Sequence, residues 1–162
     1  MPEICSVDTS PLVYLFRIGH LELLDALFDQ VLTPHAVVRE LTRGRGGGAQ
    51  TPDLADFPWI QTVETDATTI PQDLLDFGPG EQAAILLVLE NRAQQVVLDD
   101  LEARQVAQRL GVPVIGTVGL LVGAKQKGLV PSVSRLLDQL VQAGMWLSED
   151  LKRTVLDLVR EQ

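Results

Sequence analysis

The stretch Val96-Val97-Leu98-Asp99-Asp100 joins a short, wholly apolar run to two carboxylates that follow it directly. The run Ile4-Cys5-Ser6-Val7 is followed by Asp8 in the same way. Short apolar runs of this kind are typical of strands that are buried on both faces. The three aspartates then mark the carboxyl ends of two strands, which is the edge of a parallel sheet where ligands bind.

Outside these two runs, the chain continues to alternate between strand and helix patterns. Further strands are predicted at 31–32, at 59–63 on a possible sheet edge, and at 112–115. Apolar spacing predicts helices at 11–28 with a break near Gly19, and at 34–42, 81–93, 101–110, 118–127, 132–143 and 149–160. We therefore expect a three-layer α/β/α fold with a central parallel five-stranded sheet. One domain, 1–162, would have a core at about 4–128 and a C-terminal helical extension at about 131–162.

Two local signals refine this outline. Thr33-Pro34 places a capping residue and a proline where the helix at 34–42 is expected to start. The run Gly44-Arg45-Gly46-Gly47-Gly48 predicts a mobile loop after that helix.

Composition narrows the class of protein. The 162 residues are 46% hydrophobic and 22% charged, which is typical of a globular protein, and no run of about 18 apolar residues predicts a transmembrane helix. The N-terminal residues do not resemble a signal peptide, and the single cysteine, Cys5, fits a buried core position, so we expect a reducing, cytoplasmic setting. The formal net charge of −9 argues against passive binding of nucleic acid, because phosphate contacts need a basic surface.

Two glutamates extend the set of candidate ligands. Glu40 lies beside the apolar stripe that Val37 and Leu41 mark on the helix at 34–42, and Glu81 opens the helix at 81–93. Simpler interpretations remain open: Asp8 as a helix cap, Glu81 as a favourable charge at a helix N-terminus, and Glu40 as a solvated side chain.

Clustering of all five acids would raise their pKa values unless a cation compensated for the repulsion. Oxygen ligands alone suit Mg²⁺ or Mn²⁺ better than softer metals. His20 and His35 are the only histidines, which are too few for a typical zinc site, and we interpret both as surface or helix-end residues.

Four ordered motifs resemble those of PIN domains. They are Asp8-Thr9-Ser10-Pro11-Leu12, the segment from Pro34 to Glu40-Leu41, Gly80-Glu81-Gln82-Ala83-Ala84-Ile85, and Leu98-Asp99-Asp100-Leu101-Glu102-Ala103-Arg104. The resemblance covers Ile4 to about Gly128 and is nearest to short prokaryotic PIN-like proteins, many of which are ribonuclease toxins of type II toxin–antitoxin pairs.

The resemblance implies that Asp8, Glu40, Glu81 and one or both of Asp99 and Asp100 hold Mg²⁺ or Mn²⁺. Leu98-Asp99-Asp100 stands where PIN domains usually have Thr-x-Asp, so which aspartate is the direct ligand stays open.

Four further residues are candidates for supporting roles. Thr9, Ser10 and Thr117 are placed to hydrogen-bond the carboxylates or a phosphate, although hydroxyl groups after strands are also common caps. Arg104 is placed to contact a phosphate or to pair with Asp100 across one helical turn, and the pair is slightly favoured.

The implied function is metal-dependent cleavage of RNA phosphodiesters, with an antitoxin as a partner. A homodimer is also expected, because short PIN proteins commonly pair and the last two predicted helices are rich in apolar residues: Leu136, Leu137, Leu140, Val141, Met145, Trp146, Leu151, Val155, Leu156 and Val159. The main alternative is a non-catalytic PIN-like module that binds a partner. A phosphoryl-transfer receiver ranks lower, because its acidic pair would follow the first strand, and no Gly-x-Gly-x-x-Gly supports a dinucleotide-binding domain.

Overall fold

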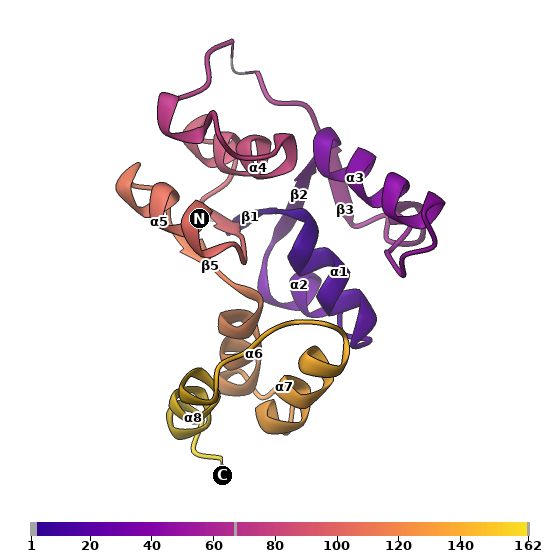
Figure 1. Ribbon diagram of the computed structural model, residues 1–162, viewed down its shortest axis with the longest axis vertical. Helices are drawn as coiled ribbons and strands as arrows, with labels where there is room; N and C mark the ends of the chain where they lie inside the picture. Colours follow the sequence, from indigo (N-terminus) through magenta and orange to yellow (C-terminus); the bar gives the residue numbers. More distant parts are fainter. Residues whose placement is uncertain (1–2, 67, 162) are drawn as a thin grey trace.

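Five parallel strands form the centre of the molecule, as the computed structural model, which describes residues 3–66 and 68–161, shows (Figure 1). The strands lie in the order β3-β2-β1-β4-β5. This arrangement confirms the predicted parallel sheet, with β1 at its centre and β3 at an edge. The strands are β1 (Ile4–Val7), β2 (Gln30–Pro34), β3 (Ile60–Val63), β4 (Gln95–Val97) and β5 (Val114–Ile115).

Helices cover both faces of this sheet and complete a PIN-like three-layer α/β/α fold (Figure 1). One apolar cluster joins α4 and α5 to the sheet, and the other joins it to α1, α2, α3, α6, α7 and α8. The helices are α1 (Thr9–Arg17), α2 (Leu23–Leu27), α3 (His35–Gly46), α4 (Pro79–Leu89), α5 (Leu101–Arg109), α6 (Thr117–Gln126), α7 (Val133–Gln142) and α8 (Glu149–Leu158), with single 3₁₀ turns η1 (Leu54–Asp56) and η2 (Gln72–Leu74).

The alternation of side chains along β4 explains why consecutive residues at its end are apolar. Val96 packs into the cluster under α4 and α5, whereas its neighbour Val97 packs into the cluster on the opposite face. Cys5 is fully buried, as expected from its apolar surroundings. The buried Ser6 hydroxyl donates to the carbonyl oxygen of Ala84 at 2.8 Å, which satisfies the one polar side chain of β1.

Two local predictions around α3 were wrong. Thr33 does not cap this helix: it lies in β2, and its hydroxyl donates to the carbonyl oxygen of Val7 at 2.8 Å, so that the helix begins only at His35. The glycine-rich segment is also not wholly a loop, because α3 continues to Gly46. Thr51 folds back and donates to the Leu41 carbonyl oxygen at 2.9 Å, which holds the following chain against this end of the helix.

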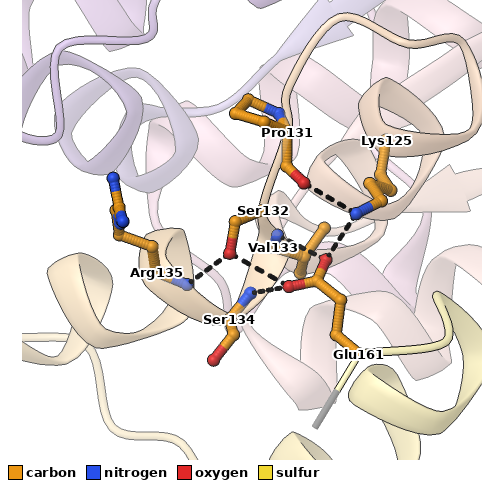
Figure 2. Close-up of polar contacts among 7 residues, drawn as sticks. All are labelled: Lys125, Pro131, Ser132, Val133, Ser134, Arg135 and Glu161. Atoms are coloured by element: carbon orange, nitrogen blue, oxygen red, sulfur yellow. Dashed lines mark hydrogen bonds and ion pairs between the residues drawn. The ribbon is translucent and has the colours of Figure 1, made fainter.

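Glu161, just beyond α8, is bound to the start of α7, as Figure 2 shows. The Glu161 carboxylate accepts hydrogen bonds from the backbone amides of Val133 (2.7 Å) and Ser134 (3.0 Å), and from the Ser132 hydroxyl (3.0 Å). It also pairs with Lys125 of α6 at 3.0 Å. A residue just beyond α8 therefore ties three helices together by capping one of them.

The longest predicted helix, 11–28, is interrupted as expected. Gly19 adopts a φ of +77°, a conformation that glycine accepts without strain, and the chain turns there between α1 and α2. Among the described residues, no helix has the length and apolar character needed to cross a bilayer.

Candidate functional site

Asp8 is the most deeply buried carboxylate at the carboxyl edge of the sheet. It follows β1, and its backbone amide donates to the Val97 carbonyl oxygen of β4 at 3.1 Å. Its side chain is 5% exposed and makes no capping hydrogen bond to α1, although Asp8 occupies the N-cap position. The Oδ1 atom is buried without a hydrogen-bond partner. The helix-cap interpretation of Asp8 is therefore wrong, and one of its two carboxylate oxygens lacks the hydrogen bond that buried polar atoms normally have.

The surroundings of Asp8 disfavour its charged form. Burial raises its pKa to about 7; the backbone hydrogen bond with Thr9 opposes this effect, and the negative charges of Glu81, Glu40 and Asp99 add to it. The negative charges that act on Asp8 thus come from three other parts of the fold: α4, α3 and the end of β4. The sequence could place Asp8 and Asp99 on one edge, but it could not place the two glutamates.

Glu40 is held by two other elements. Thr9 of α1 donates a hydroxyl hydrogen bond to its Oε2, and the backbone amide of Gly80 donates to its Oε1 at 3.1 Å. A Cβ atom at position 80 would lie 2.7 Å from that Oε1, so only glycine leaves room for the carboxylate. Glu40 is therefore not the solvated side chain of the simpler interpretation, and it joins α3 to the starts of α1 and α4.

Glu81 stands in the first turn of α4, next to the glycine that receives Glu40. Burial raises its pKa; the charge of Asp100 adds to this, a hydrogen bond from the Gly78 backbone opposes it, and the charge of Glu40 adds a smaller increase. Glu81 and Asp100 line the same 800 Å³ cavity between α4 and α5. Glu81 therefore links the carboxylates near Asp8 to Asp100 on the outer side of the edge.

The neighbouring aspartates Asp99 and Asp100 have different partners. Both oxygens of Asp99 are used by Thr117 at the start of α6: the backbone amide and the hydroxyl each donate at 2.7 Å. Burial raises the pKa of Asp99, whereas these bonds and the positive charge of Arg104 oppose the increase. Asp100 is exposed and caps α5, with its Oδ1 accepting from the Ala103 amide at 2.9 Å. The negative charge of Asp99 therefore acts on Asp8, whereas Asp100 fills the capping role.

The supporting residues divide in a similar way. Thr9 and Thr117 hydrogen-bond to carboxylates of the set, as one of the two interpretations expected. In the part of the chain that the structure describes, Arg104 forms no ion pair with Asp100 within 4.0 Å, so the favoured pairing was wrong. Its charge acts on Asp99 instead, and its Nε is buried without an acceptor. Ser10 lines a neighbouring groove together with Arg104.

The candidate carboxylates are not arranged as a closed ligand shell for a metal ion. Across residues 3–66 and 68–161, no group of three His, Cys, Asp or Glu side chains is arranged to hold a metal ion. The donor chemistry nevertheless suits a hard divalent cation, because every candidate donor is a carboxylate oxygen and the buried Oδ1 of Asp8 has no other partner. A cation would also offset the repulsion that raises the pKa of Asp8.

Two glycines leave room for side chains of the site, a role that the sequence did not predict. Gly80 admits Glu40, and Gly116 lies against both Asp99 and Arg104, where a Cβ atom would stand 3.2 Å from Oδ1 and 3.1 Å from Nη1. Gly80 directly precedes Glu81, and Gly116 directly precedes Thr117. A glycine next to a candidate site residue was therefore the feature of the sequence that could have indicated a close approach.

Comparison with known proteins agrees with the fold described above. A family model described as a PIN domain matches residues 4–161. Searches of curated proteins and of solved structures gave no match. PIN domains are generally nucleases, a class in which carboxylates at the edge of a parallel sheet have a direct use. Because this match spans residues 4–161, the chain belongs to the PIN-domain family.

Proposed function

We propose that this protein is a metal-dependent endoribonuclease that uses Mg²⁺ or Mn²⁺. The observation that carries the proposal is Asp8, a buried carboxylate with an unpartnered oxygen and a pKa raised to about 7. Asp8, Glu40, Glu81 and Asp99 would hold the metal, and Asp100 would act beside them from its capping position. A nuclease-type family supports the same reaction class.

The chain's own contacts suggest how each ligand would be positioned. The strand before Asp8 fixes its backbone, Thr9 and the Gly80 amide orient Glu40, and Thr117 orients Asp99. A bound divalent ion lowers the pKa of an attacking water and offsets charge on the phosphate. Preorganised carboxylates reduce the cost of assembling such a site, because their rotamers are already restricted.

RNA is the proposed substrate, and a toxin–antitoxin pair is the proposed setting, with an antitoxin protein as partner. A non-catalytic module that binds a partner is the second candidate. Two observations favour that candidate: the formal net charge of −9, and the lack of a closed ligand group in the described part of the chain. The two functions differ in whether metal binding leads to cleavage.

Melting and cleavage together test the proposal. We expect Mn²⁺ to raise the melting temperature above the value in EDTA, by the equivalent of about 2.7 kcal/mol at a hundredfold excess over the dissociation constant. We also expect cleavage of single-stranded RNA by the wild type and by Asp138→Asn, an exposed control on α7, but not by Asp8→Asn. Identical melting with and without metal would refute the metal site. Metal binding without cleavage would favour the partner-binding module.

The homodimer remains a prediction, but only part of the apolar surface on which it was based is exposed to a partner. Half of the ten apolar residues that suggested it are buried in the molecule's own core: Leu136, Leu137, Leu140, Val155 and Val159. Val141, Trp146 and Leu151 stay exposed. Light scattering should give about twice the chain mass of 17.7 kDa, and a mass near 17.7 kDa across micromolar concentrations would contradict the dimer.

A further inference from the structure

A groove of about 640 Å³ begins at the carboxylate site and runs away from it along the molecule. Asp99, Asp100 and Arg104 line one end. Apolar side chains of α6, α8 and the connection before α8 line the rest, including Val122, Leu151 and the aromatic ring of Trp146. The groove therefore has a polar end next to the candidate ligands and an apolar body next to that end.

Trp146 is the feature of this groove that the fold does not explain. It lies between α7 and α8 and is 84% exposed, more than any other large apolar side chain in the described part of the chain. An indole ring in water contributes little to the stability of the fold, whereas an exposed ring at the edge of a concave surface provides a flat contact for a ligand. Tyr14 of α1 adds a second aromatic side chain to the lining.

Arg104 gives the polar end its positive charge. It is the only lysine or arginine among the described residues that line the groove, and no carboxylate lies within 4.0 Å of its guanidinium group. The charge of Arg104 acts on Asp99 without a direct ion pair, so its guanidinium group can also contact an external anion. A ligand for this groove should therefore carry a negative group at one end and a flat apolar group at the other.

We propose that the groove binds one unpaired nucleobase of a single-stranded nucleic acid, with Trp146 as the stacking surface and Arg104 as the contact to the adjoining phosphate. The inference rests on the proposed function for its orientation, because the polar end lies at Asp99 and Asp100. A nucleotide combines both required features in one unit, and aromatic side chains stack on every base. A base within a duplex is unavailable for such stacking, so the groove selects single strands.

The wall that carries Leu151 and Val155 is fixed in place from its far end. Both residues belong to α8, and Glu161 beyond this helix is bound to the start of α7 and to Lys125 of α6 (Figure 2). The groove is therefore formed before a base arrives, which reduces the ordering cost of binding.

Binding of a fluorescently labelled ten-nucleotide single-stranded RNA, measured by anisotropy in EDTA, tests the groove without any cleavage. At about 0.15 M salt, charges farther apart than roughly 8 Å are screened, so stacking dominates the comparison. We expect Trp146→Ala to weaken binding by about 5-fold to 150-fold, the equivalent of about 1–3 kcal/mol for one stacked base. Trp146→Phe should retain most of the affinity. The matched control is Trp59→Phe, because Trp59 packs against Phe57 outside the groove.

Four results would overturn the proposal: equal affinity of the wild type and Trp146→Ala, no measurable binding of the RNA, equal binding of an abasic strand, or a change in molar mass on Trp146→Ala. The last result would assign the groove to a second copy of the chain. Melting with Mn²⁺ is the separate readout for the metal site, and Trp146→Ala should leave it unchanged. Trp146-dependent binding without metal-dependent cleavage would refute the proposed function and leave the groove proposal standing.

Discussion

Replacing Asp8 by asparagine should stabilise the protein in the absence of metal. Burial and neighbouring charges raise the pKa of this carboxyl from 3.8 to about 7, so the folded state prefers the protonated form. The stability gained from protonation is fully present below pH 3.8 and is lost as the pH rises through about 7. A shift of this size corresponds to roughly 4 kcal/mol of lost stability at alkaline pH. Because the asparagine amide also needs partners, we take that figure as an upper bound for Asp8→Asn.

Thermal melts in EDTA at pH 4.5 and pH 8 measure this effect. For a chain of this length about 1 kcal/mol moves the melting temperature by roughly 2–4 °C, so Asp8→Asn should melt up to roughly 8–16 °C above the wild type at pH 8. The difference should shrink strongly at pH 4.5, and Asp138→Asn, an exposed control on α7, should match the wild type at both pH values. If Asp8→Asn melts below the wild type at pH 8, the carboxylate has a stabilising partner and the expected gain in stability is refuted.

Two further substitutions test the contacts around this site and at the end of the chain. Gly80→Ala places a Cβ 2.7 Å from a Glu40 oxygen, so it should lower the stability by about 1–3 kcal/mol and reduce the melting shift with Mn²⁺. The control is Gly123→Ala, which should be neutral or stabilising because nothing lies within 4 Å of its Cβ. Equal melting temperatures of the two variants would contradict the close approach at Gly80. Burial alone would raise the pKa of Glu161, but its hydrogen bonds outweigh this effect and lower the pKa to about 2. The charged carboxylate therefore stabilises the fold, and Glu161→Gln should lower the melting temperature at pH 7. That contribution is present above the unfolded pKa of about 4.5 and is lost as the pH falls towards 2, so wild type and variant should converge in acid, and a constant difference would argue against the charge.

The sequence by itself determined the sheet and the position of its functional edge. Strands buried on both faces must be apolar throughout, so Ile4–Val7 and the run at 96–98 were visible without knowledge of their neighbours. The buried stripe of α3 was visible for the same reason, and both Val37 and Leu41 are fully or almost fully buried. Because parallel strands end at one edge, the aspartates that follow β1 and β4 had to lie on the same side of the molecule.

Only the tertiary structure decided how these carboxylates are used. Thr9 lies 31 residues from Glu40, and Gly80 lies 40 residues from it, so the contacts depend on how α1, α3 and α4 pack and not on any local pattern. Likewise, each aspartate after a strand has the same local tendency to cap the next helix. Asp100 does so, whereas Asp8 is buried without a cap bond and Asp99 turns to Thr117. The choice depends on which donors the folded chain places nearby, and sequence spacing does not contain that information.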